Sequence, residues 1–369
     1  MKRVKKMLIM QNNLKRQYEL NAIEYETKAV EVLRNGWYIL GNEVAAFEKE
    51  WSEYIGIRHC VGLASGLDAL WISFKLLGIG ESDEVIVSSN AYIACVMGIT
   101  MNGATPVFVE PDIYNNIDAN KIEKAITPKT KAILAVHLFG QACDMTEIMR
   151  ISRSYGLKVV EDCAQSHGNK WKGQTVGTFG DVGCFSFYPS KGCGAFGDAG
   201  AIVTNSEELD HKFRVYRNYG SEKRYNNEVV GTNSRLDELQ AGLLRVKLAH
   251  MDEINKERNR LANRYLSEIR RDNIALPKIR SGADSSWHQF VIRSERRNEL
   301  LEYLKNYNIG SLIHYPVPPH LSKAYHYLGW KYGDYPIAEK AADEVLSLPM
   351  YNGMTDEEQG YVIQVINKF

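Results

Sequence analysis

The chain has 369 residues, of which 44% are hydrophobic, so it can bury a large core and we expect two domains. Its 45 basic and 45 acidic residues give a formal net charge of zero, which gives no support to a nucleic-acid partner. No apolar run approaches the roughly 20 residues that span a bilayer, and the N-terminus lacks a cleavage-like site. The six cysteines form no CxxC pair, so we expect reduced thiols in a cytoplasmic protein without a membrane partner.

The first predicted elements are helices. An amphipathic pattern predicts one helix over residues 18–35 and a second over residues 44–55. A short strand over 60–63 then leads into Ser65, Gly66 and Leu67, which open a further helix. Because a helix N-terminus offers free backbone N–H groups, this turn is either a phosphate site or a plain serine-capped helix start.

Strands alternate with helices in the next part of the chain. Predicted strands over 84–88, 105–110 and 131–137, with a helix over 118–126, favour a mostly parallel sheet with right-handed crossovers. Tyr92 follows the first of these strands at a helix start, where a core position and a ligand contact are both reasonable. His137 has no partner ligands at a useful spacing, so we expect a hydrogen-bonded core histidine and no metal.

A glycine-rich stretch around Lys191 carries the strongest chemical signal. A strand over 182–187 precedes it and a strand over 201–204 follows it, with Gly192, Gly194, Gly197 and Gly200 in between. Glycines permit tight turns and close backbone approach, so we expect Lys191 to be held at a fixed place between two strands. It is either a surface hairpin lysine or a desolvated nucleophile that attacks a carbonyl group.

An acid upstream of Lys191 favours the second alternative. A predicted strand over 157–161 ends immediately before Asp162. An acid just past a strand, together with a buried lysine, is the pair that pyridoxal phosphate needs. The lysine forms the Schiff base, and the carboxylate keeps the pyridine nitrogen protonated so that the ring can accept electrons. Ligands of parallel sheets bind beyond the carboxyl ends of the strands, where both residues fall.

The remainder of the chain is predicted to be mostly helical. Ser206 begins a helix that reaches about residue 219, and after a polar loop a long helical pattern covers 236–269, broken near Met251. A strand over 287–292 and a helix over 297–307 follow, and Pro316, Pro318 and Pro319 then give an extended segment. Three more helices are expected over 321–328, 337–346 and 356–368.

Several ordered motifs are similar to those of one known family. SFYPSK with GDAGAIVTN, and VVEDCAQSHG before them, resemble the DegT/DnrJ/EryC1/StrS family of nucleotide-sugar aminotransferases, over about residues 38–348. The resemblance implies an α/β protein with the fold-type I fold of pyridoxal-phosphate aminotransferases. We expect a large cofactor-binding domain over residues 1–250, with a mostly parallel central sheet, and a smaller C-terminal α+β domain over 251–369.

The resemblance also implies roles for particular residues. Lys191 would be the catalytic lysine and pyridoxal 5′-phosphate the cofactor, with Asp162 at the ring nitrogen, Gln165 at the ring's phenolic oxygen and Tyr92 stacked on the ring. The phosphate would be held by Ser65, Gly66, Leu67 and Ser186, although many family members have threonine at the position of Leu67. Asn233, in the GTNSR segment, would reach the phosphate of a neighbouring subunit, which makes the protein a homodimer with shared active sites. Tyr188, Arg224, His314 and Tyr315 would contact the substrate.

The expected activity is transamination of a nucleotide-linked keto-sugar with L-glutamate as the amino donor. The segments SNAYIA, NYGSEKRYNNEVVGTNSRLDELQAGLLRVKL and HYPVPPHL resemble the subgroup that aminates C3 of dTDP-linked 3-keto-6-deoxyhexoses. A 4-keto substrate stays open. So does a non-catalytic regulator on the same fold, although Lys191, Asp162 and Gln165 together disfavour it. The family's dehydratase branch carries a histidine at the position of Lys191.

Overall fold

The centre of the molecule is a seven-stranded sheet, seen in a computed structural model that describes residues 8–223 and 225–369. The strand order is β1-β9-β8-β5-β4-β2-β3. The run from β3 to β8 is parallel, and only β9 runs antiparallel to its two neighbours, so the predicted α/β fold with a mostly parallel sheet is confirmed. The strands are β1 (His59–Leu63), β2 (Glu84–Ser88), β3 (Thr105–Val109), β4 (Thr130–Val136), β5 (Lys158–Asp162), β8 (Val182–Ser186) and β9 (Gly200–Thr204).

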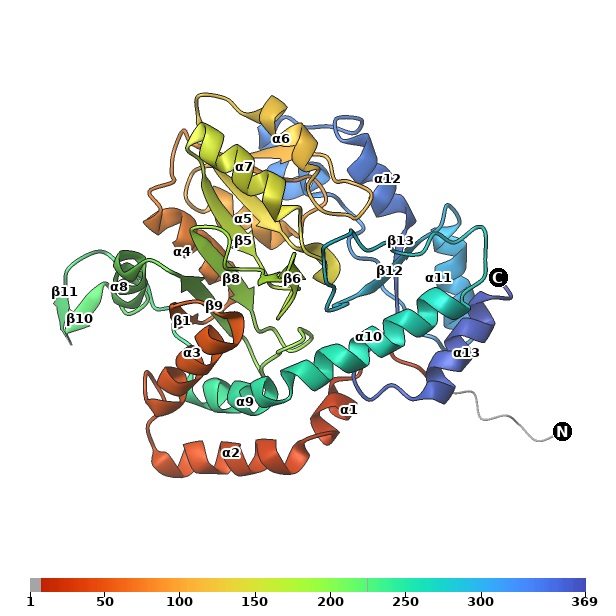
Figure 1. Cartoon of the computed structure of the whole chain (residues 1–369), viewed down its shortest axis with the longest axis horizontal. Coiled ribbons are helices and arrows are strands. Elements are labelled where there is room, and N and C mark those ends of the chain that lie inside the picture. Colours follow the sequence, from red (N-terminus) through yellow and green to blue (C-terminus); the bar gives the residue numbers. More distant parts are fainter. Residues whose placement is uncertain (1–7, 224) are drawn as a thin grey trace.

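Helices cover both faces of this sheet (Figure 1). One face packs against α3 (Asn42–Ile55), α6 (Ala119–Ala125), α7 (Met145–Tyr155) and α9 (Glu238–Ala249). The other face packs against α4 (Gly66–Leu76), α5 (Ile93–Thr100) and α8 (Glu207–Tyr216). Because strand side chains alternate between the two faces, Val85 and Val87 lie in the second core while Ile86 lies in the first.

The structure has two helices where the sequence predicts a single helix over residues 18–35. α1 (Leu14–Glu19) and α2 (Ala22–Asn35) are separated at Asn21, whose φ of −134° and ψ of 32° interrupt the helical path. Gly36, with φ 72°, ends α2 in the left-handed conformation that glycine adopts without penalty.

A third hydrophobic core lies at the C-terminal side of the molecule. It is formed by residues between 261 and 366, together with Ile9 from the N-terminal segment, which bridges to Ile309. The core is built on α10 (Met251–Glu268), the two-stranded sheet of β12 (Phe290–Arg293) and β13 (Val345–Leu348), α11 (Arg297–Asn306) and α13 (Asp356–Ile366). The predicted break near Met251 is confirmed, because α9 ends at Ala249 and α10 starts at Met251. We propose a domain boundary at this break, which the separate third core supports.

Three C-terminal elements differ from their predictions. The helix predicted over 337–346 is α12 (Pro336–Glu344), and the apolar residues after it form β13, which pairs with β12 and is buried along its whole length. The segment 321–328 forms the short 3₁₀ turns η2 (Pro319–Leu321) and η3 (Lys323–Leu328). The strand expected from Trp287 starts only at Phe290, since Trp287 has a φ of 49°.

Two short hairpins and one 3₁₀ turn complete the structure. β6 (Lys170–Trp171) pairs with β7 (Gln174–Thr175), and η1 (Leu138–Gly140) follows β4. β10 (Ser221–Lys223) pairs with β11 (Asn226–Asn227) and extends from the body of the protein next to α8 (Figure 1). Across residues 8–223 and 225–369, no helix combines the length and the apolar character needed to cross a membrane.

Candidate active site

A cavity of about 430 Å³ lies at the carboxyl ends of β5 and β8, where ligands of parallel sheets bind. Most of the residues predicted to form the site line it, although they come from widely separated parts of the chain. These are Ser65, Gly66, Leu67, Tyr92, Asp162, Ser186, Tyr188, Lys191, His314 and Tyr315.

Lys191 lies in the loop between β8 and β9, whose close packing excludes side chains at several positions. A Cβ on Gly194 would approach the Pro189 carbonyl oxygen to 2.3 Å, and one on Gly200 would approach Ser65 backbone atoms to the same distance. Burial lowers the pKa of Lys191 to about 8, with the Asp162 carboxylate opposing that shift. In the described part of the chain, the Lys191 amine has no hydrogen-bond or ion-pair partner. It is therefore available to react.

Asp162 is the last residue of β5 and is nearly buried, with 7% of its surface exposed. Its Oδ2 accepts a hydrogen bond from Cys95 Sγ at 3.0 Å, and its Oδ1 accepts one from the Ala164 backbone N–H at 3.0 Å. These two donors fix the orientation of the Asp162 carboxyl group in the cavity that Lys191 also lines. Such a group can hold a protonated ring nitrogen.

Two aromatic rings line the cavity, and one amide lies next to them. Tyr92 and Tyr315 lie with ring centroids 4.9 Å apart at 34°. Gln165 donates to the Tyr315 hydroxyl at 3.0 Å and accepts from the Phe139 N–H at 2.6 Å. Gln165 therefore lies beside the lining residues and positions Tyr315, and its direct contact with a cofactor ring stays a prediction.

The turn at Ser65 forms a cradle that a phosphate group fits. Ser65 Oγ accepts from the Asp68 N–H at 3.0 Å and so caps α4, which leaves the first N–H groups of the helix available. A Cβ on Gly66 would lie 2.4 Å from the Ser186 Cβ, so only glycine allows these two segments to approach. A phosphate group is bound by donors such as free backbone amides and hydroxyl groups, in a space that glycine leaves open. The residues thus fit a phosphorylated cofactor.

The DegT/DnrJ/EryC1/StrS aminotransferase family model matches residues 21–367. The chain belongs to this family. It is therefore an enzyme, an aminotransferase, and pyridoxal phosphate is its cofactor, as the cofactor forms of solved relatives also indicate. The predicted family, enzyme class and cofactor are confirmed.

Most of the similar proteins are named as aminotransferases of nucleotide-linked sugars. One, from Aneurinibacillus thermoaerophilus, is a dTDP-3-amino-3,6-dideoxy-alpha-D-galactopyranose transaminase that is 48% identical, with 92% of this chain and 93% of the relative aligned. A UDP-N-acetyl-3-dehydro-alpha-D-glucosamine 3-aminotransferase from Acidithiobacillus ferrooxidans is 42% identical, over 91% of both chains. The erythromycin biosynthesis sensory transduction protein EryC1 of Saccharopolyspora erythraea is 46% identical, over 91% of this chain and 92% of the relative.

Solved structures of the family superpose closely on this chain. DesV of S. venezuelae, in complex with a ketimine intermediate, gives a TM-score of 0.96 at 44% identity and covers 98% of each chain. NtdA of Bacillus subtilis, with bound PMP, gives a TM-score of 0.89 at 32% identity, over 96% of this chain and 83% of NtdA. These structures confirm the predicted aminotransferase fold.

Two assignments from the family pattern, Asn233 and Arg224, are not tested by the residues that line the cavity. Asn233 is exposed and bridges to Asn218 on the outer surface, outside the residues that line the cavity. Arg224 lies outside the described residues. Both assignments therefore stay predictions.

The structure adds two residues that the sequence analysis did not identify. Cys95 donates to Asp162, and it lies one turn after Tyr92, so helical spacing from Tyr92 could have indicated it. His288 lines the cavity and is buried, and desolvation together with the nearby Lys191 holds its pKa well below the ordinary value, which keeps the ring neutral. No spacing or motif in the sequence pointed to His288.

His137 is the buried, hydrogen-bonded histidine that the sequence predicts. Its Nε2 lies 3.1 Å from Glu161 Oε2, and its Nδ1 accepts from the Cys143 N–H at 3.0 Å. With Cys163 these side chains place three possible ligand atoms within 4.8 Å of one another. Glu161 also accepts three backbone N–H groups, so the polar groups of this cluster are satisfied by the protein.

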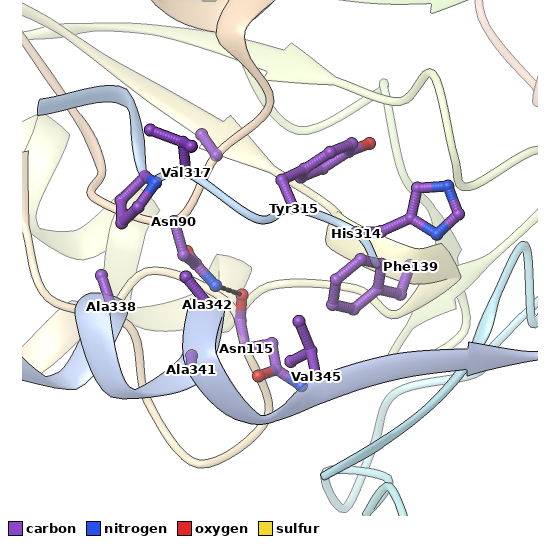
Figure 2. Close-up of a pocket in the computed structure, with 12 residues that line it drawn as sticks. Asn90, Asn115, Phe139, His314, Tyr315, Val317, Ala338, Ala341, Ala342 and Val345 are labelled. Carbon is purple, nitrogen blue, oxygen red and sulfur yellow. Dashed lines mark hydrogen bonds between the residues drawn. The ribbon is translucent and has the colours of Figure 1, made fainter. Parts of the chain in front are cut away.

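A second, small cavity of about 20 Å³ lies behind the segment that carries His314 and Tyr315. Figure 2 shows alanines of α12, Ala338, Ala341 and Ala342, opposite that segment, with Asn90 donating to the Asn115 carbonyl. A space of this size holds about one water molecule and no substrate. The 430 Å³ cavity is the candidate active site because Lys191 and Asp162 line it.

Proposed function

We propose that this enzyme converts a dTDP-linked 3-keto-6-deoxyhexose to the corresponding 3-amino-3,6-dideoxy sugar, with L-glutamate as the amino donor. The observation that carries the chemistry is the Lys191 amine, whose pKa burial lowers to about 8 beside Asp162. A lysine with this pKa is partly neutral near pH 7 and can act both as a nucleophile and as a base.

We assign each residue of the site a role in this reaction. Bound pyridoxal phosphate supplies an electron sink for the carbon that gains or loses the amino group. Lys191 Nζ holds the cofactor at rest and, once free, takes up and returns the proton at the reacting carbon. The Asp162 carboxylate would hold the proton at the ring nitrogen, and Tyr92 would cover the ring. Ser65, Gly66, Leu67 and Ser186 would hold the phosphate group, and Gln165 would bind the ring's phenolic oxygen.

The sugar would occupy the open side of the cavity. Tyr188, which is 55% exposed, lines the cavity together with His314 and Tyr315, and His314 Nδ1 lies 2.7 Å from Ser347 Oγ. Burial, with Lys191 nearby, lowers the pKa of His314 to about 4, so it meets the substrate as a neutral hydrogen-bonding group. Arg224 would contact the diphosphate of the nucleotide.

Amination at C3 is supported by the names of the relatives. The A. thermoaerophilus and A. ferrooxidans relatives are both named for position 3 of the sugar, although one name has dTDP and the other UDP. We choose dTDP because that relative has the higher identity, 48% against 42%.

A cytoplasmic homodimer with shared active sites is part of the proposal. Several large apolar side chains are exposed, among them Val230 at 93%, three residues before Asn233, and Trp37 at 63%, which is typical of a surface that another protein covers. Asn233 itself faces outward and would complete the phosphate site of the partner chain.

Two other activities are less consistent with the site. The dehydratase chemistry of the family would require a histidine at position 191, where this chain has lysine. A 4-keto sugar would need the same residues with a different placement of the ring, and only an assay distinguishes it.

The test is to incubate the holoenzyme and L-glutamate separately with a dTDP-3-keto-6-deoxyhexose, its 4-keto isomer and a UDP-linked 3-keto sugar. Because a shift of about 1 Å at the reacting atom can cost about a hundredfold in rate, one isomer should be clearly preferred. We expect NMR to identify the 3-amino dTDP sugar as the main product. Amination of the 4-keto sugar alone would refute the proposed substrate, while the aminotransferase chemistry would stand.

A further inference from the structure

One buried serine joins the phosphate cradle to the segment that carries Asn233. Ser234 is 1% exposed, and its hydroxyl donates to Asp68 Oδ2 at 2.7 Å and accepts from the Ala64 N–H at 3.2 Å. Ala64 directly precedes Ser65, and Asp68 is the residue whose N–H is capped by Ser65. A single hydroxyl therefore holds both flanks of the turn on which the cofactor phosphate would rest.

The backbone around Ser234 is held as firmly as its side chain. The Ser234 N–H donates to the Arg217 carbonyl at 3.0 Å, and the Thr232 N–H donates to the Tyr216 carbonyl at 2.8 Å. Between them, Asn233 bridges to Asn218. Successive side chains of an extended segment point in opposite directions, so Ser234 faces its own cradle while Asn233 faces outward.

The residue that supports this segment is also fixed to the cradle. Arg217 is nearly buried, and its Nη1 donates to the Gly62 carbonyl at 2.7 Å and to the Glu48 carboxylate. Gly62 belongs to β1, the strand that leads into Ser65. The cradle and the Asn233 segment are thus two parts of one hydrogen-bonded unit, connected through Ser234 and through Arg217.

We propose that Ser234 is a positioning residue that couples the two active sites of the dimer. In its own chain it shapes the phosphate cradle, and through the adjacent backbone it places Asn233 in the site of the partner chain. This inference rests on the proposed dimer. A change at Ser234 is therefore expected to alter cofactor binding in both sites: in its own cradle and, through Asn233, in the site of the partner chain.

Hybrid dimers separate the two roles of Ser234. In a dimer of one Lys191→Ala chain and one chain with Lys191, only the second chain shows the visible absorbance of lysine-bound cofactor, so a titration reports one site. Adding Ser234→Ala to the Lys191→Ala chain tests its effect on the partner's site. Adding it to the other chain tests its effect on its own cradle. Asn233→Ala on the Lys191→Ala chain is the control for a shared site, and Ser152→Ala, a buried serine on α7, is the matched control for fold.

We expect Ser234→Ala to weaken pyridoxal-phosphate binding about fivefold or more in its own chain and several-fold in the partner's site. If Asn233→Ala weakens the partner's site and Ser234→Ala does not, the coupling is refuted and the shared site stands. If neither variant affects the partner's site, the proposed shared dimer is refuted with it.

A second measurement keeps the inference testable if Ser234→Ala chains do not fold. In the same hybrid dimers, Ser234→Cys, which keeps the size of the side chain but donates a weaker hydrogen bond, should weaken pyridoxal-phosphate binding in its own site and in the partner's site. Ser234→Thr, which keeps the hydroxyl, should leave both affinities within about twofold of wild type. Unchanged binding in the partner's site for Ser234→Cys would overturn the coupling.

Discussion

Glu161 and Asp162 are adjacent acids on β5, and their contacts show how the same charge serves structure on one face of a sheet and chemistry on the other. Glu161 is fully buried and accepts from the Gly177, Phe179 and Gly180 N–H groups at 2.7 to 2.8 Å, with His137 at 3.1 Å. Asp162 accepts two hydrogen bonds and opens onto the cavity that contains Lys191.

Both carboxyl groups are buried, so burial does not distinguish them. They differ in how many hydrogen bonds their oxygens already accept from the protein. The oxygens of Glu161 are occupied by protein donors, which tie the loop 177–180 to the sheet. Asp162 has acceptor capacity left, and it faces a lysine that has no partner among the described residues. A buried carboxylate that can accept further hydrogen bonds, in a cavity with an unpaired amine, can bind a ligand. A carboxylate whose oxygens are already fully hydrogen-bonded to the protein can only stabilise the fold.

The largest effect in this comparison is expected for Lys191→Ala. Activity should fall about a thousandfold or more because the nucleophile and the base are both lost, while the cradle at Ser65 still binds the cofactor. Steady-state rates and cofactor binding of the folded variant measure this. Lys247→Met is the matched control, since burial also lowers the pKa of that lysine but it does not line the cavity. Substantial activity in Lys191→Ala would show that another group is the nucleophile.

Asp162→Asn should lower kcat about a hundredfold to a thousandfold. The amide keeps the shape of the side chain but removes the charge that would hold the ring nitrogen protonated. The melting temperature should change little, because only two hydrogen bonds depend on this carboxylate. Unchanged kcat would assign Asp162 to the fold along with Glu161.

Glu161→Gln should show the opposite pattern. The amide group cannot accept from three backbone N–H groups and His137 together, so the free energy of unfolding should fall by about 2 to 3 kcal/mol. Rates per folded, cofactor-loaded molecule should stay within about twofold of wild type. Urea unfolding and active-site titration separate these quantities. A large loss of kcat with unchanged stability would contradict the distinction between the two acids.

The effect of pH on the rate of cofactor binding is expected to be smaller than the effects of the active-site substitutions. Because the pKa of Lys191 is lowered to about 8, its amine is protonated below that pH and becomes neutral above it. The rate at which apo enzyme binds pyridoxal phosphate covalently should therefore rise about tenfold from about pH 7 to about pH 9, following the fraction of neutral amine. Stopped-flow absorbance measures the rate. A rate that is flat over this range would show that the amine titrates elsewhere.

The sequence predicted those residues of the site whose places depend on local pattern, namely on where a strand ends, where a helix begins and where glycines allow a tight turn. Asp162 and Lys191 follow apolar strands, and Ser65 caps a helix, so local pattern fixed all three. The positions that depend on tertiary pairing were missed. Val345 and Leu346 were predicted as the end of a helix, because only pairing with β12 makes them part of a strand. His288 lines the cavity only because of how the C-terminal part packs. The engagement of Gln165 with Tyr315 depends on a contact between residues 150 positions apart.

The most direct test of the account is to locate the cofactor on the chain. Borohydride reduction of the holoenzyme fixes pyridoxal phosphate to the lysine that holds it, and peptide mass spectrometry then identifies that lysine. We expect the label on the peptide that contains Lys191, and its loss in Lys191→Ala. Label on any other lysine, or the same label in Lys191→Ala, would contradict the assignment of Lys191 and with it the contrast between Asp162 and Glu161.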